Sequence, residues 1–413
     1  MKVIGRFLFL IAAFAGFFLV GFFVRDAFAK EAPNGKAFAR LMGNKSAQKT
    51  PTEVFSDNLD IIAQNAAVQP DPLKLRYSAM SGLVSSLGDP HTNFLEPVVA
   101  EALALDTRGN FQGIGARLGG DPLGAKVGTV FRDGPAKKAG LQPNDIITGV
   151  DGLNVSGMVV DEIVEKIKGP EGTRVVLTVM RESASEPIRI PITRAVVLIP
   201  TAEGKMLPNK VGYVQVSGFS ELTAKQFKTE LNALKQQGMQ KLVIDLRSNP
   251  GGLLNAAADM LSYFFADKPV VTMKGRNGDT QTARTNKGQV IKLPQDVVIL
   301  INEDSASASE IFSGVMQDYG RAKLVGTHSY GKASVQELRQ LPEGATAKIT
   351  IAKYFIPSGR DISRKLDEDG DYISGGLKPD YEVELELTEK TEIGNPEQDS
   401  QLKRALEILG IAG

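Results

Sequence analysis

The chain has 413 residues, with 48 Lys and Arg balanced by 48 Asp and Glu, no Cys, no Trp and two His. This length predicts about two or three domains with substantial cores, and zero net charge gives no electrostatic reason to expect nucleic acid as a partner. The absence of Cys excludes disulfides, zinc–thiolate sites, iron–sulfur clusters and thiol nucleophiles, and two His are too few for a three-His metal site.

Residues 1–29 have the pattern of an export signal. Lys2 and Arg6 supply the positive start, residues 7–24 are an uninterrupted run of apolar residues and glycine, and a small-x-small cleavage motif ends at Ala29. The apolar run is also long enough to cross a bilayer. We therefore expect an exported protein of the periplasm or cell envelope, with the segment either cleaved or retained as an inner-membrane anchor.

The next two segments predict a linker and a helical region. Residues 30–52 are polar and rich in small residues, as linkers are. Apolar residues at helical spacing indicate helices over 55–62 and 73–87, within an N-terminal helical region at 53–105. Because this region is too short for a rich core and has apolar stripes on both helices, we expect it to pack against a second copy, giving a homo-oligomer.

Residues 108–185 predict a compact α+β module. One amphipathic helix presents Val160, Ile163 and Val164 on one face, and short strand patterns surround it at 114–118, 127–131, 145–150 and 174–181. The glycines of Gly113-Ile114-Gly115 would let consecutive backbone amides face one carboxylate, so that an extended peptide could pair with the strand edge. On the glycine spacing alone, a glycine-rich turn beside an ordinary packing face explains the same residues more simply.

Residues 186–390 alternate strand and helix patterns, which predicts an α/β domain with largely parallel pairing. A C-terminal helical segment follows at 391–413. The acidic residues 367–371 fit a solvated hairpin tip better than a calcium loop, because the glycine comes too early and no closing Glu follows. The strand patterns are 211–216, 241–246, 297–301, 323–325, 347–356 and 381–387, and the helix patterns are 221–237, 253–265 and 307–319.

Two strand-to-helix junctions in this domain could carry chemistry. Residues 245–252 end in two glycines before a helix, where free amides suit an oxyanion hole, although a tight turn would need the same residues. The second junction holds Ser305, Ser307 and Ser309, any of which could be a nucleophile or a helix cap. Lys332 follows, and a lysine can serve as base where burial lowers its pKa.

Two competing motifs are weaker. Residues 326–332 match the first part of a phosphate-binding loop, but Ala333 stands where such a loop needs a hydroxyl for Mg²⁺. A Ser–His–Asp triad would have to use His91 or His328, and neither has a recognisable triad context.

Taken together, the chain resembles the carboxyl-terminal processing peptidases, also called tail-specific proteases. The resemblance covers nearly all of residues 54–409. One departure is visible, since the family usually has Phe-Gly-Lys-Gly at residues 330–333 and this chain has Tyr-Gly-Lys-Ala. The motifs that carry the resemblance occur in the family's order and are Asp89-Pro90-His91, Phe94-Leu95, residues 245–252, residues 305–310, Gly331-Lys332 with Gln336, Pro357-Ser358-Gly359-Arg360 and Lys378-Pro379-Asp380.

The resemblance implies an α+β multidomain protein with the helical region, a PDZ domain at 108–185 and an α/β protease domain of the ClpP/crotonase type. It implies Ser307 as nucleophile, Lys332 as general base and Gln336 as the residue that orients the lysine. The oxyanion donors would be the amides of Ala308 and of Gly251 or Gly252. The PDZ residues that bind the peptide would be Gly113, Ile114, Gly115, Val160, Ile163 and Val164.

The expected function is an envelope serine endopeptidase that needs no cofactor or metal and cleaves proteins with apolar carboxyl-terminal tails. An activating adaptor or lipoprotein is a further expected partner, and nucleic acid is not. The alternative is a non-catalytic PDZ adaptor that tethers envelope proteins.

Overall fold

The computed structural model describes residues 49–69, 71–386 and 391–411, which fall into two units that meet between Met80 and Ser81. The predicted export signal at 1–29 and nearly all of the predicted linker at 30–52 lie outside the described residues. In the part of the chain that the structure describes, no helix is both long and apolar enough to span a membrane.

The two helices predicted near the N-terminus are confirmed as α3 (Pro51–Asn65) and α4 (Pro72–Ser85). Helix α3 begins before the apolar pattern because Thr50 and Glu53 form a capping box, in which each side chain bonds the other's backbone amide. Neither helix buries a residue. Large apolar side chains are therefore exposed on α3, at Val54, Phe55, Ile61 and Ile62.

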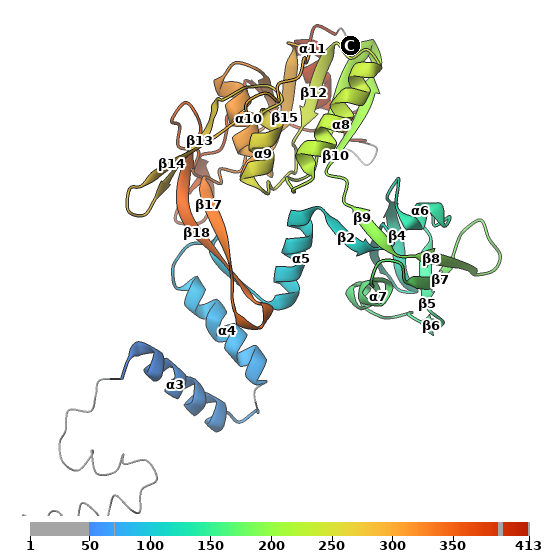
Figure 1. The fold of residues 1–413 in the computed structure, drawn as a ribbon, viewed down its shortest axis with the longest axis vertical. Helices are drawn as coiled ribbons and strands as arrows, with labels where there is room; N and C mark the ends of the chain where they lie inside the picture. The colour runs from blue at the N-terminus through green and yellow to red at the C-terminus, as the bar shows by residue number, and fades with distance from the viewer. Residues whose placement is uncertain (1–48, 70, 387–390, 412–413) are drawn as a thin grey trace, which may run out of the picture. The chain divides into compact units, whose positions relative to one another are not determined.

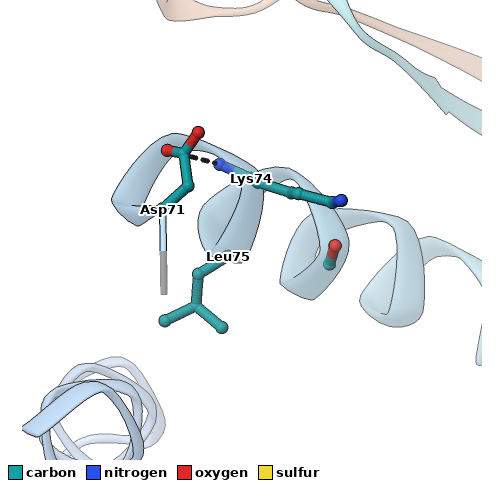
Figure 2. A pocket seen from close by; sticks show the side chains of 4 residues that line it. Asp71, Lys74 and Leu75 are labelled. Atoms are coloured by element: carbon teal, nitrogen blue, oxygen red, sulfur yellow. Dashed lines mark hydrogen bonds between the residues drawn. The ribbon is translucent and has the colours of Figure 1, made fainter. Parts of the chain in front are cut away.

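A small hollow lies along the start of α4 and is lined by Asp71, Lys74, Leu75 and Ser78 (Figure 2). Asp71 Oδ1 accepts hydrogen bonds from the amides of Leu73 (2.8 Å) and Lys74 (3.4 Å). The carboxylate therefore serves to cap the helix, as an aspartate before a first helical proline commonly does.

The segment after α4 contains a strand and a helix that the apolar pattern did not predict. Strand β1 (Asn93–Leu95) pairs antiparallel with β18 (Thr346–Phe355), and helix α5 (Pro97–Arg108) follows. A proline begins α5, and Gly109 ends it in the left-handed conformation at φ 72°.

The predicted α+β module is confirmed (Figure 1). Its strand order is β3-β4-β5-β7-β8, with β6 paired to β5 and with β3 at one edge. The first strand starts two residues later than predicted, because Gly115 has a φ of +79° and turns the chain there. The elements are β3 (Ala116–Asp121), β4 (Gly124–Val130), α6 (Pro135–Lys138), β5 (Ile146–Val150), β6 (Leu153–Asn154), α7 (Val160–Ile167), β7 (Arg174–Met180) and β8 (Ile188–Thr193), and the separate pair β2 (Asn110–Gly113) and β9 (Ala195–Leu198) precedes and follows them.

The domain that follows has the predicted α/β architecture in three layers (Figure 1). Its sheet has the order β10-β11-β12-β15-β16-β21, and every pair except β10–β11 is parallel. Alternate strand residues face α8, α9 and α10 on one side and α11 on the other. The elements are β10 (Ala202–Leu207), the short 3₁₀ turn η1 (Pro208–Lys210), β11 (Val211–Val216), α8 (Thr223–Gln236), β12 (Lys241–Asp245), α9 (Leu254–Leu261), β15 (Val297–Ile301), α10 (Ala308–Asp318), β16 (Lys323–Gly326), β21 (Tyr381–Glu382) and α11 (Ser400–Ile408).

A second sheet of this domain is built on β18. Strands β1, β17 (Ser334–Gln340) and β13 (Pro269–Gly275) all pair with it, and β14 (Thr280–Arg284) pairs with β13. The turn η2 (Pro342–Gly344) joins β17 to β18. The predicted acidic hairpin tip is confirmed, since β19 (Lys365–Leu366) and β20 (Tyr372–Ser374) pair on either side of it.

Candidate active site

Three neighbouring strands bring the predicted site residues to one edge of the parallel sheet. Strand β15 pairs with β12 on one side and with β16 on the other, and all three run in the same direction. The loops at their carboxyl ends are 246–252, 302–307 and 327–333. The carboxyl edge of a parallel sheet is where such folds place their ligands, and these loops carry the two glycines, the serines and Lys332.

The structure distinguishes the three serines that the sequence left equivalent. Ser305 and Ser309 are fully buried, and their hydroxyls donate to the carbonyls of Leu246 (2.8 Å) and Asn249 (2.9 Å). Ser307 is partly exposed and has φ 55° and ψ −113°, an uncommon conformation for a residue with a side chain. Of the three, Ser307 has the strained turn and the accessible hydroxyl expected of a nucleophile.

Through its side chain, Glu310 connects the loop that contains Ser307 (302–307, the serine loop) with the loop that contains Lys332 (327–333, the lysine loop). Its side chain is completely buried in the first turn of α10. Oε2 accepts the amides of Ser307 (2.8 Å) and Lys332 (2.9 Å), and Oε1 accepts the amide of Gly331 and the hydroxyl of Ser329, both at 2.6 Å. Burial raises the pKa of Glu310, although these four hydrogen bonds favour the ionised form. The backbone amides of Ser307 and Lys332 therefore donate to the same oxygen of Glu310.

Tyr354 makes a second connection between the same two backbones. Its side chain is buried on β18, and its hydroxyl lies 2.6 Å from the carbonyl oxygen of Lys332 and 3.3 Å from that of Ser307. Burial and the nearby Glu310 raise the pKa of Tyr354 well above its usual value, so the phenol stays protonated.

Lys332 has the environment that a lysine base requires. Loss of solvent, reinforced by Lys348, lowers the pKa of Lys332, while Glu310 and Asp89 act in the opposite direction. Its ammonium makes no hydrogen bond or ion pair with any residue that the structure describes. The neighbouring Ala333, where the family usually has glycine, is buried, and its carbonyl accepts the amide of Tyr354 (3.0 Å).

The loop at 246–252 (the glycine loop) packs directly against Ser307. A Cβ added to Gly251 would lie 2.8 Å from Cβ of Ser307 and 2.9 Å from the amide nitrogen of Ala308, so no larger residue fits there. The amide of Gly251 donates to Asn249 Oδ1 (2.9 Å). Among the described residues the amides of Gly252 and Ala308 have no acceptor. This arrangement favours Gly252 over Gly251 as the second donor to an oxyanion.

A buried charge network holds the start of the glycine loop. The Arg247 guanidinium donates to both oxygens of Asp399 (2.9 and 2.7 Å) and to Asp245. Asp399 also caps α11 by accepting the amide of Leu402 (3.0 Å). Burial opposes ionisation of Asp399, but the hydrogen bonds from Arg247 outweigh it and hold its pKa below its usual range. The C-terminal helix is thereby joined to the loop that carries Gly252.

The side chain of Gln336 lies on β17 and points toward β18. Its Nε2 donates to the hydroxyls of Ser334 (2.7 Å) and Thr350 (3.3 Å). No hydrogen bond joins it to Lys332 in the described part of the chain. The orienting role that the resemblance implied for Gln336 therefore stays a prediction, and any effect on Lys332 would act through the hairpin.

In the PDZ-like module, the predicted peptide-binding residues fall into two groups. Ile114 and Ile163 belong to its core, and Ile163 is fully buried, which leaves Val160 and Val164 partly exposed on α7. The amides of Ile114 and Gly115 have no acceptor within the described residues. They precede β3, the edge strand that α7 contacts.

The two histidines have different surroundings. His328 stacks on Tyr372 with ring centroids 4.1 Å apart, and its Nδ1 lies 3.0 Å from the carbonyl oxygen of Ser329. His91 lies within electrostatic range of Lys332 and Lys348. Among the described residues no carboxylate hydrogen-bonds either imidazole, which agrees with the low weight given to a triad.

Glu310 and Tyr354 are the site residues that the sequence reasoning missed. Glu310 follows Ser307 by three positions, and this spacing also fits a helix cap, so it does not identify a site residue. Tyr354 is one aromatic residue in an apolar strand pattern. Neither role could be read locally, because both depend on contacts with the loop at 329–332.

The fold and this cluster of serine, lysine and backbone amides define a serine-type α/β peptidase domain that follows a PDZ module. Comparison with known families agrees. Residues 210–383 match the model of Peptidase family S41, and residues 126–181 match a PDZ domain. Residues 210–383 are therefore an S41 peptidase domain, and residues 126–181 are a PDZ domain.

Individual relatives support the same assignment. The chain is 34% identical over 311 residues to a probable CtpA-like serine protease of Staphylococcus haemolyticus, which covers 75% of this chain. It is 34% identical over 316 residues to a protein of the same description from Staphylococcus aureus strain COL. The chain spans about 60% of the length of these relatives. A putative S41 protease from Bacteroides fragilis, of known structure, has the same fold, with a TM-score of 0.50, 17% identity and coverage of 85% of this chain and 96% of that one.

Proposed function

We propose that the protein is an exported endopeptidase that cleaves proteins near their carboxyl termini, with Ser307 and Lys332 as a catalytic dyad. The observation that carries the proposal is the Glu310 carboxylate, which binds the backbones of both residues at the carboxyl edge of the sheet. An unpaired, partly buried lysine beside a strained serine needs no histidine or metal to activate the hydroxyl.

In the proposed reaction, Lys332 in its neutral form removes the proton of Ser307 Oγ while this oxygen attacks the peptide carbonyl. The carbon–nitrogen bond then breaks, and the proton passes from Lys332 to the leaving amine. The amides of Ala308 and Gly252 stabilise the negative charge on the carbonyl oxygen. A water molecule, deprotonated by Lys332, hydrolyses the resulting ester and restores Ser307.

Substrate tails are proposed to bind the PDZ domain as an added strand. The unpaired edge of β3 supports this, because an extended peptide can extend the sheet there. The free amides of Ile114 and Gly115 would receive the terminal carboxylate, and Val160 and Val164 would contact the apolar last side chain. An amidated tail should accordingly bind the Ser307→Ala protein more weakly than the same tail with a free carboxylate.

The location and the partners are proposed on sequence grounds. The pattern of residues 1–29 supports export to the periplasm or cell envelope. The exposed apolar residues of α3 support a homo-oligomer, and mass measurement by light scattering would test it. The activating adaptor or lipoprotein stays a prediction.

The dyad is tested with an unstructured protein substrate that ends in an apolar tail. We expect Ser307→Ala and Lys332→Ala each to abolish cleavage, while Lys274→Ala, an exposed lysine on β13, keeps the wild-type rate. Near-wild-type turnover by either dyad variant would refute the assignment. A non-catalytic PDZ adaptor would bind the tail in all of these proteins and cleave it in none.

A further inference from the structure

A turn at residues 89–92 lies against strand β18, and the proposed mechanism gives it no role. The Asp89 carboxylate closes this turn, since it accepts the amide of His91 (3.0 Å) and the hydroxyl of Thr92 (2.5 Å). Thr92 is buried, and its Oγ1 accepts the amide of Thr350 on β18 (3.0 Å). The turn is thus hydrogen-bonded to β18, the strand that pairs with the Gln336 strand β17.

The same carboxylate reaches the hairpin that follows Lys332. Thr92 Oγ1, which donates to Asp89, accepts the amide of Thr350, and the Thr350 hydroxyl accepts Nε2 of Gln336 (3.3 Å). Gln336 and Thr350 are direct partners in the β17–β18 ladder. A path of hydrogen bonds therefore runs from Asp89 through Thr92 and Thr350 to Gln336, four residues after the proposed base.

The charged and titratable groups around Lys332 come from three places in the fold: helix α10, strand β18 and the 89–92 turn. Glu310 lies on α10, Lys348 on β18, and Asp89 and His91 in the turn, while the phenol of Tyr354 faces the lysine's carbonyl oxygen. Burial lowers the pKa of His91, with help from Lys332 and Lys348 and against Asp89, so the imidazole is uncharged at neutral pH. Asp89 is then the charge of the turn that acts on Lys332.

We propose that Asp89 is a positioning residue for Lys332, because it fixes Gln336 through Thr92 and Thr350 and anchors the 89–92 turn to the hairpin that follows Lys332. The inference rests on the proposed role of Lys332 as base. Its consequence is that the segment before β1, which the sequence assigned to a helical region, is part of the catalytic apparatus of the protease domain.

The experiment measures kcat and KM for the tailed substrate as a function of pH, in the full chain. Asp89→Asn removes the charge, and Thr350→Val removes the hydroxyl that accepts Gln336, the last step of the path, while keeping the strand. Asp121→Asn is the matched control, since Asp121 likewise accepts the amide two residues later (Leu123, 2.9 Å), in the β3–β4 hairpin.

We expect Asp89→Asn and Thr350→Val each to lower kcat about tenfold, with KM within about twofold. The kcat of the double variant should fall little further, because both changes interrupt the same path of hydrogen bonds. Because the Asp89 charge favours the ammonium form of Lys332, Asp89→Asn should also move the acid limb of kcat/KM to lower pH, whereas Thr350→Val should leave it in place. A merely structural role would not separate the two variants in this way.

Wild-type kcat in both variants, or an acid limb that Asp89→Asn does not move, would overturn the inference and leave the dyad untouched. Should Asp89→Asn fail to fold, wild-type kcat in Thr350→Val alone would be enough to overturn it. Retained cleavage by Ser307→Ala, measured in the same series, would instead refute the proposed function.

Discussion

Replacing Asp399 tests whether the C-terminal helix stabilises the glycine loop. Asp399→Ala leaves Arg247 buried with Asp245 and Gln401 as its remaining partners. It also removes the side-chain acceptor for the amide of Leu402 at the start of α11. Removing one partner of a buried ion pair lowers the free energy of unfolding by about 3–5 kcal/mol. Loss of a helix cap lowers it by about 1 kcal/mol.

Because Asp245 still pairs with Arg247, we expect the low end of the first range and a total near 4 kcal/mol. For a domain of this size that lowers Tm by about 10 °C. Thermal melts and urea unfolding of the full chain measure the change. Glu407→Gln on the same helix is the control, because its pair with Arg404 (2.8 Å) is exposed and should contribute less than about 1 kcal/mol.

The pH dependence gives a second check. The pKa of Asp399 is lower in the folded protein than its usual 3.8, so its contribution to stability is present above that value and is lost as pH falls through the folded pKa. The difference between wild type and Asp399→Ala should therefore be largest near neutral pH and shrink in strong acid. A loss below about 1 kcal/mol at pH 7 would refute the reasoning, since no buried pair would then have been broken.

Two further changes test the geometry around Ser307. Ser309→Ala removes one hydrogen bond of a buried hydroxyl, and Ser305→Ala removes the bonds to Leu246 and Asn302. Each variant should destabilise the fold by about 1 kcal/mol per hydrogen bond while cleavage of the tailed substrate continues. Abolished turnover in a folded Ser305→Ala or Ser309→Ala protein would move the nucleophile to that serine. Glu310→Gln sets an amide NH₂ against two of the four donors that now meet the carboxylate, so kcat should fall at least about tenfold. The partly exposed Glu337→Gln should match wild type. Equal kcat in both would show that Glu310 does not hold the site.

The sequence predicted the main sheet well because its strands are buried on both faces. Runs such as 297–301 are apolar at every position, and the structure buries every one of these residues. The sequence did not predict strand β17, because this strand is not buried on both faces. Its polar residues carry no strand pattern of their own, and pairing with β18 holds them in place.

At the site, the sequence identified the loops but not the contacts between them. Glycines, serines and a lysine at strand ends are local features. The bond from Lys332 to Glu310 joins residues 22 positions apart, and the bond from Thr350 to Thr92 joins residues 258 positions apart. No periodicity or motif encodes such pairings, so Asp89 and Glu310 acquire their roles only in the folded chain.

The shared carboxylate of Glu310 has a consequence for how this enzyme could be switched on and off. Its four hydrogen bonds include the amides of both proposed catalytic residues, and the group is buried. Separating the serine loop from the lysine loop would remove several of these hydrogen bonds from the buried Glu310 carboxylate at the same time. Intermediate spacings are therefore disfavoured, and any control that separates these two loops should act as an all-or-none transition between an assembled and a disassembled centre. A graded response would then arise only from the fraction of molecules in each state.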